Sequence, residues 1–124
     1  MTEISVLVVE DSFYSADLNV RELKKADFTV RRYQMVSSGQ SLRQALEDGG
    51  WDLILSDHSM PNFSALEALE IRNRKSHDTP FIIVSEDISR KEIEDALKDG
   101  CTAYVSKENL TELRTIAADI LKNK

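Results

Sequence analysis

Short apolar runs alternate with longer amphipathic segments along the whole chain. Residues 4–9, 53–55 and 81–84 are almost wholly apolar. Such runs are typical of strands that are covered on both faces, as in a parallel sheet. Residues 28–33 alternate apolar and polar positions instead, which predicts a strand at the edge of the sheet. Residues 102–105 form a fifth, shorter strand segment.

The segments between these runs carry the spacing and the end signals of helices. Ser12 stands where it can cap the first helix, and Ser38-Gly39 is expected to begin a loop into the second. Ser64 and Ser89 each precede a glutamate by three residues, which is the pattern of a capping box at the start of the third and fourth helices. Residues 109–112 are expected to cap the last helix, whose apolar stripe is the most regular in the chain.

The same patterns predict which helix residues are buried and which face water. The fourth helix is expected to bury an apolar stripe made of Ile93, Ala96 and Leu97. The third helix ends in a basic cluster, which suits the negative end of the helix dipole. This cluster is expected to be solvated and consists of Arg72, Arg74 and Lys75.

Five strands that alternate with five helices predict an α/β fold with a parallel sheet, right-handed crossovers and helices on both faces. The first, third and fourth strands are expected at the centre of the sheet because they are wholly apolar. The 124 residues fit one domain, 1–124, without a linker or a low-complexity segment. Open sheets of this class place their sites outside the carboxyl ends of the strands.

Charge and cysteine content argue against several classes of protein. The formal net charge of -6 disfavours a nucleic-acid-binding surface, which would carry a basic patch. No apolar run is long enough for a transmembrane helix, and the stretch Met1-Thr-Glu-Ile is acidic where a signal peptide would be basic. One cysteine, Cys101, excludes an internal disulfide and a cysteine-based zinc site. A cytoplasmic protein that binds neither nucleic acid nor membrane is therefore expected, with His58 and His77 exposed to solvent rather than acting as ligands.

Polar residues with complementary chemistry follow the strands of the predicted sheet. Glu10-Asp11 follows the first strand, Asp57 the third, Ser85 the fourth and Lys107 the fifth. The carboxyl ends of parallel strands lie on one edge of a sheet, so these residues are expected to share one crevice. Three carboxylates suit a hard cation such as Mg²⁺, and a hydroxyl with a lysine suits a bound phosphoryl group.

Four motifs at these strand ends are similar to those of response regulator receiver domains, the CheY-like family of two-component signalling. They are Val9-Glu10-Asp11-Ser12, Ser56-Asp57-His58-Ser59-Met60-Pro61, Ile83-Val84-Ser85 and Ala103-Tyr104-Val105-Ser106-Lys107. The resemblance covers essentially the whole chain, in order and at the expected spacing. It implies a (βα)5 doubly wound sheet with strand order 2-1-3-4-5, which is the flavodoxin-like three-layer αβα sandwich.

The resemblance implies a role for each residue of the crevice. Asp57 matches the nucleophile that accepts a phosphoryl group from a phosphohistidine and becomes an aspartyl phosphate. Asp11 and Asp57 match direct ligands of Mg²⁺ (or Mn²⁺), the backbone carbonyl of Ser59 matches a third ligand, and Glu10 matches a residue that reaches the metal through water. Lys107 matches the lysine that pairs with the phosphoryl oxygens.

The resemblance also implies a switch beside this crevice. Ser85 matches the hydroxyl that moves toward the phosphoryl group, and Tyr104 matches the aromatic residue that changes rotamer with it. Packing alone would also explain a tyrosine at this position. Ser59 and Asp87 match positions that tune the lifetime of the phosphorylated state.

Three residues depart from the usual family pattern. Glu86 follows the switch serine where a small residue is usual, and its bulk and charge are expected to slow phosphorylation. Ala65 replaces a usual glycine, which would strain the chain if φ there were positive. Glu108 replaces a usual proline, so the isomer of the Lys107–Glu108 bond stays open.

The resemblance implies a phosphoacceptor receiver domain, which is a signalling domain and not a turnover enzyme. Its phosphodonor would be a histidine kinase or a histidine phosphotransfer protein. A downstream protein would read the surface formed by the fourth helix, the fifth strand and the fifth helix, and the resemblance leaves room for a homodimer.

Two other functions stay open at this point. A phosphorylation-independent interaction module on the same fold fits the departures at Glu86 and Ala65, although the intact crevice argues against it. A phosphohydrolase with an aspartyl-phosphate intermediate would usually carry a second aspartate two residues after the nucleophile, where this chain has Ser59.

Overall fold

The structure is a computed structural model that describes residues 2–122, and strands and helices alternate along it. The strands are β1 (Thr2–Val9), β2 (Phe28–Val36), β3 (Leu53–Ser56), β4 (Phe81–Ser85) and β5 (Ala103–Ser106). The helices are α1 (Phe13–Lys25), α2 (Gly39–Asp48), α3 (Ala65–Lys75), α4 (Arg90–Lys98) and α5 (Glu112–Lys122). The strands pair in parallel in the order β2-β1-β3-β4-β5. The predicted α/β fold and its strand order are therefore confirmed.

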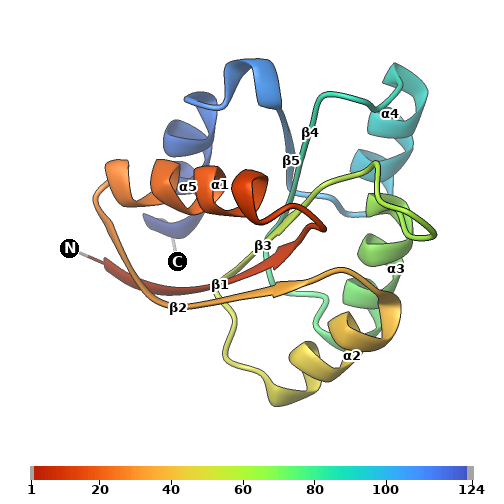
Figure 1. The fold of residues 1–124 in the computed structure, drawn as a ribbon, viewed down its shortest axis with the longest axis horizontal. Helices are drawn as coiled ribbons and strands as arrows, with labels where there is room; N and C mark the ends of the chain where they lie inside the picture. Colours follow the sequence, from red (N-terminus) through yellow and green to blue (C-terminus); the bar gives the residue numbers. More distant parts are fainter. Residues whose placement is uncertain (1, 123–124) are drawn as a thin grey trace.

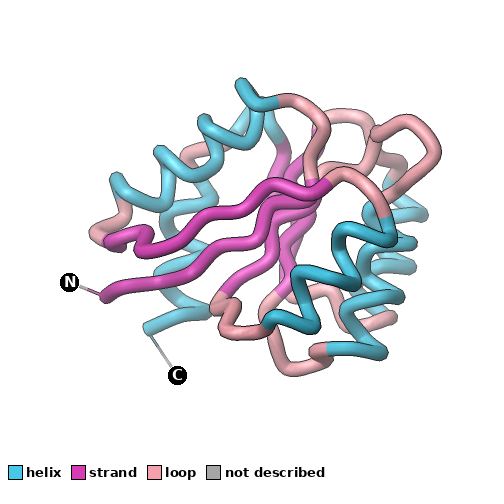
Figure 2. The backbone as a smooth tube through the Cα atoms, turned by 60° about the horizontal axis from the view of Figure 1, so that its bottom comes forward, coloured by secondary structure: helices cyan, strands magenta, loops and turns pink. Residues whose placement is uncertain are grey.

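The sheet lies between two helical layers (Figures 1 and 2), with α1 and α5 on one face and α2, α3 and α4 on the other. Alternate residues of β1 enter the two cores: Val6 and Val8 pack in the core under α1 and α5, and Leu7 and Val9 pack in the opposite core. Because both faces are covered, a central strand needs no polar alternation. The edge strand β2, by contrast, exposes residues 31–34.

Serine side chains cap four of the helices. Ser12, Ser64 and Ser89 each accept the backbone N–H of the third residue that follows. The predicted capping box is complete at Ser89 with Glu92, whereas at Ser64 only the bond from the N–H of Glu67 forms. The prediction of a loop at Ser38-Gly39 is wrong, because Ser38 itself caps α2 and that helix begins at Gly39. The predicted cap at Asn109 is also wrong, since Asn109 lies in a 3-10 turn (Lys107–Asn109) and α5 begins only at Glu112.

Two predictions about helix side chains are wrong as well. Arg72 is only 6% exposed, because its guanidinium donates hydrogen bonds to the carbonyls of Thr79 and Gly100. Leu97 is 47% exposed, because α4 rests on the sheet through a narrow stripe in which Ala96 is its buried residue. In both cases the contacts with neighbouring segments, and not the pattern along the helix, set the exposure of the side chain.

The backbone is unstrained at two of the positions that depart from the family pattern, Ala65 and Glu108. Ala65 is the buried first residue of α3 and does not have positive φ; in this loop Asn62 takes the left-handed conformation, with φ 60°. The strain considered at Ala65 is therefore absent. The Lys107–Glu108 bond is trans, since residues 2–122 contain no cis peptide bond. Within the same residues, no helix is long and apolar enough to cross a membrane.

Candidate functional site

Strand register places the predicted site residues beside one another. Val9 pairs with Ser56, and the N–H of Asp57 donates to the carbonyl of Val9 at 2.9 Å. One strand further along the sheet, Ser85 pairs with Ser106. The residues that follow these pairs therefore emerge at the same edge of the sheet, as the parallel topology requires.

Three carboxylates and one ammonium meet at this edge. Glu10, Asp11 and Asp57 each offer an oxygen, and these oxygens lie within 4.8 Å of one another. Glu10 is 1% exposed and Asp57 is 7% exposed, while Asp11 faces solvent. The Lys107 Nζ lies 3.2 Å from Glu10 Oε2 and 3.5 Å from Asp57 Oδ1. The other oxygen of Glu10 accepts the backbone N–H groups of Asp11 and Ser12, which fixes the carboxylate in this position.

The electrostatics of the cluster favour a bound cation. Burial raises the pKa of Glu10, the nearby Asp57 carboxylate raises it further, and Lys107 opposes both effects. Burial works against the charge on Lys107, but the carboxylates of Glu10 and Asp57 outweigh it and raise the pKa of the ammonium. One ammonium does not balance three carboxylates, and all the ligand atoms are hard oxygens. The residues present therefore fit Mg²⁺ or Mn²⁺.

The predicted switch residues lie next to the cluster and contact one another. Ser85 is 1% exposed, and its Oγ accepts the N–H of Asp87 at 3.3 Å. Tyr104 is half-buried, and its Oη donates to the carbonyl of Ser85 at 3.0 Å. Ser59 Oγ donates to the carbonyl of Asp87 at 3.0 Å and lies 3.2 Å from its Oδ2, so the loops after β3 and β4 are joined. Glu86, in the loop after β4, is exposed to solvent.

His58 is not the exposed residue that the sequence predicts. Its side chain is 11% exposed, and its Nε2 lies 2.9 Å from Glu92 Oε2 on α4. Its Nδ1 is buried and has no hydrogen-bond partner among the described residues. A carboxylate 34 residues away in the chain explains the burial, and no local pattern signals it. His77, whose side chain is 75% exposed, agrees with the prediction.

Two exposed aromatic residues at the rim of the site escaped the sequence reasoning. Phe13 and Tyr14 open α1 directly after Asp11-Ser12, and they are 78% and 74% exposed. Adjacent aromatic residues at a helix start, outside the buried stripe of that helix, were the available signal. Large exposed apolar side chains next to a functional site are typical of a protein-contact surface.

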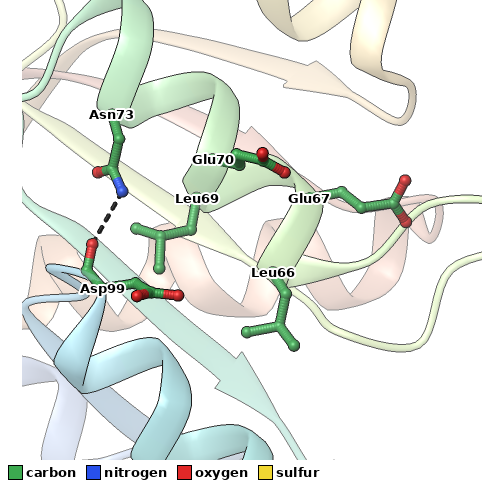
Figure 3. A pocket seen from close by; sticks show the side chains of 6 residues that line it. All are labelled: Leu66, Glu67, Leu69, Glu70, Asn73 and Asp99. Atoms are coloured by element: carbon green, nitrogen blue, oxygen red, sulfur yellow. Dashed lines mark hydrogen bonds between the residues drawn. The ribbon is translucent and has the colours of Figure 1, made fainter.

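A separate surface hollow of about 500 Å³ lies between α3 and α4 (Figure 3). The Nδ2 of Asn73 donates to the carbonyl of Asp99 across it at 2.8 Å. Its lining consists of Leu66, Glu67, Leu69, Glu70, Asn73 and Asp99. This hollow shares no residue with the cluster at the strand ends and is not part of that site.

Comparison with known proteins gives the family. The model of the response regulator receiver domain matches residues 6–118. The chain is 32% identical over 120 residues to the transcription factor SKN7 of Saccharomyces cerevisiae, which covers 96% of this chain and 19% of that protein. It is 25% identical over 118 residues to hybrid signal transduction histidine kinase G of Dictyostelium discoideum, which covers 92% of this chain and 3% of the kinase. The chain thus spans a fifth or less of these relatives.

Solved structures share the fold. The receiver domain of the sensor histidine kinase PA1611 from Pseudomonas aeruginosa superimposes with a TM-score of 0.78 at 20% identity, over 98% of this chain and 99% of that one. That structure has a magnesium ion coordinated in its active-site cleft. The match over residues 6–118 and the parallel 2-1-3-4-5 sheet agree. The chain belongs to the family of response regulator receiver domains of two-component systems.

Proposed function

We propose that this receiver domain accepts a phosphoryl group on Asp57 with the help of Mg²⁺ (or Mn²⁺) and then slowly hydrolyses it. The observation that carries the proposal is the position of the Asp57 carboxylate, which is buried beside Glu10, Asp11 and the Lys107 ammonium. A carboxylate nucleophile, a set of oxygen ligands and a fixed cation are the parts that phosphoryl transfer needs.

The chain supplies each part of the reaction. An Asp57 oxygen forms a bond to phosphorus as the phosphorus–nitrogen bond of a phosphohistidine breaks, and the imidazole leaves with the electron pair of that bond. Lys107, already 3.5 Å from Asp57 Oδ1, pairs with the phosphoryl oxygens. Asp11, Asp57 and the Ser59 carbonyl would hold Mg²⁺ directly, and Glu10 through water. When bound, the ion neutralises the negative charge that gathers in the transition state.

Contacts of Ser85 offer a route from the site to the surface. Its hydroxyl oxygen accepts the N–H of Asp87, and donation of its O–H to a phosphoryl oxygen would draw the β4–α4 loop toward Asp57. The Ser85 carbonyl holds the hydroxyl of Tyr104 on β5, so Tyr104 must adjust with it. The surface of α4, β5 and α5, where Leu97 is already exposed, would then present a different face to a downstream protein.

The phosphodonor in this proposal is a histidine kinase or a histidine phosphotransfer protein. The relatives fit such a pathway, since one is a hybrid histidine kinase and another a transcription factor. Phe13 and Tyr14 at the rim of the site would contact the donor while its phosphohistidine reaches Asp57. The proposal also covers the downstream signalling output of the whole protein and the formation of a homodimer.

Intact-mass spectrometry after incubation with a phosphodonor tests this function. Acetyl phosphate and a promiscuous histidine kinase should each add one phosphoryl group in Mg²⁺ and none in EDTA. Asp57→Asn should abolish the adduct, while Asp78→Asn, which changes a carboxylate with a 93% exposed side chain, should not. A folded wild-type protein that gains no mass with either donor would favour the phosphorylation-independent module. Steady turnover of a phosphate ester would favour a phosphohydrolase.

A further inference from the structure

The residue after the phosphoacceptor is bonded to α4. The imidazole of His58 places Nε2 2.9 Å from Glu92 Oε2, and the other oxygen of Glu92 accepts the N–H of Ser89 at 3.0 Å. Ser89 is the N-cap of α4, and its hydroxyl accepts the N–H of Glu92 in return. One carboxylate therefore joins the start of α4 to the loop that carries Asp57.

Glu92 is the one polar partner of the His58 imidazole among the described residues. His58 Nδ1 is buried and has no hydrogen-bond partner among residues 2–122, so only one of the two ring nitrogens is hydrogen-bonded. A buried polar atom without a partner is unfavourable, and such an atom in a folded protein calls for an explanation. The hydrogen bond between Nε2 and Glu92 therefore holds the ring in this orientation.

A second bond runs beside the first. Ser59 donates to Asp87 in the segment between β4 and α4, and His58 is bonded to Glu92 in the first turn of α4, so both residues that follow Asp57 are tied to this part of the chain. The apolar packing of α4 is limited, since Ala96 is its one buried residue. The orientation of the Asp57 loop and the position of the start of α4 are thus set together.

We propose that Glu92 is a positioning residue for the chemistry at Asp57. Through His58 it fixes the loop that presents the phosphoacceptor and the Ser59 carbonyl, and it ties α4 to that loop independently of Ser85 and Tyr104. The inference rests on the proposed function, because its effect is seen in phosphoryl transfer. The simpler role for Glu92 is that of a cap residue, which would stabilise α4 without affecting Asp57.

Variants of this chain separate the two roles. His58→Leu removes the bond but keeps the buried volume, and Glu92→Ala removes both the bond and the cap. Ser89→Ala removes the cap acceptor while leaving His58 and Glu92 in place. His58→Gln keeps a side-chain N–H donor for Glu92 and is the conservative variant. The side chain of Glu92 is 39% exposed, so its replacement leaves the core intact.

The test measures the rate of phosphorylation by acetyl phosphate in Mg²⁺, and the rate at which the adduct is lost, by intact mass. His58→Leu and Glu92→Ala should each slow phosphorylation about three- to tenfold, which is the effect of losing about one typical hydrogen bond. The double variant should be no slower than the slower single variant, because both remove the same bond. His58→Gln should restore most of the rate, and Ser89→Ala should stay within about twofold of the wild type.

Other results would contradict specific parts of the proposal. Equal slowing in Glu92→Ala and Ser89→Ala, with a normal rate in His58→Leu, would reduce Glu92 to a cap residue. Independent effects that multiply in the double variant would show that His58 and Glu92 do not act through each other. A wild-type protein that forms no adduct would refute the proposed function and this inference together, whereas a normal wild-type adduct with unchanged variant rates would refute only the inference.

Discussion

Replacing Arg72 with methionine should destabilise this domain far more than replacing Arg74 with methionine in the same helix. The Arg72 Nε donates to the carbonyl of Thr79 at 2.8 Å, and its Nη1 donates to the carbonyl of Gly100 at 3.2 Å. Arg74 pairs with Glu70 at the surface, where the two side chains are 76% and 66% exposed. The two arginines therefore have the same chemistry in opposite surroundings.

The contacts of Arg72 set the magnitude. Without the guanidinium, two carbonyls lose a charged donor, and each such loss costs about 1–3 kcal/mol. Taking the guanidinium charge out of water is unfavourable, which also lowers the pKa of Arg72, and methionine removes this cost. The net loss for Arg72→Met should be about 2–4 kcal/mol. The surface pair of Arg74 is worth about 0.3–0.5 kcal/mol.

Urea and thermal unfolding of the two variants measure this difference. A loss of about 3 kcal/mol corresponds to a fall in Tm of about 10 °C for a domain of this size. The dependence of the unfolding free energy on urea should keep its slope, since the fold is unchanged. If Arg72→Met were as stable as Arg74→Met to within about 0.5 kcal/mol, water would have to replace the guanidinium, and the reasoning would fail.

Three further predictions concern the rim of the site, the switch loop and the contact between α1 and α5. The variant with both Phe13→Ala and Tyr14→Ala should accept a phosphoryl group from a protein donor about tenfold more slowly, while its rate with acetyl phosphate should be unchanged. Equal slowing with both donors would contradict a docking role. Glu86→Ala should speed phosphorylation by acetyl phosphate about two- to fivefold, because an exposed carboxylate weakly repels an anionic donor, and an unaccelerated mass-spectrometric time course would exclude that role. The hydrogen bond from Arg114, together with its charge, lowers the pKa of Glu22 below 4.5, so the pair stabilises the fold above that pH and the contribution is lost as the pH falls through the lowered value. Glu22→Gln should therefore cost about 1–2 kcal/mol at pH 7 and progressively less as the pH falls below 4.5 in urea unfolding, and a loss independent of pH would refute the pair.

The sequence by itself determined the elements, the class of fold and the edge of the sheet at which the charged residues meet. Wholly apolar runs must be covered on both faces, and their alternation with helices permits a parallel sheet with the runs at its centre. The ends of parallel strands share one edge, so Glu10, Asp57 and Lys107 could be brought together before any coordinates were known. The sequence did not determine φ at Ala65, because the path of the whole loop sets it, and here Asn62 takes the left-handed conformation instead.

Only the tertiary structure decided the surroundings of single side chains. A basic residue at a helix end is normally solvated, yet Arg72 is buried because Thr79 and Gly100, 7 and 28 residues further along the chain, offer carbonyls to it. The His58 side chain is only 11% exposed because α4 brings Glu92 to it from 34 residues away. Local periodicity specifies which face of an element turns inward, but it carries no information about which distant group that face will meet. Contacts between segments far apart in the chain therefore had to come from the fold itself.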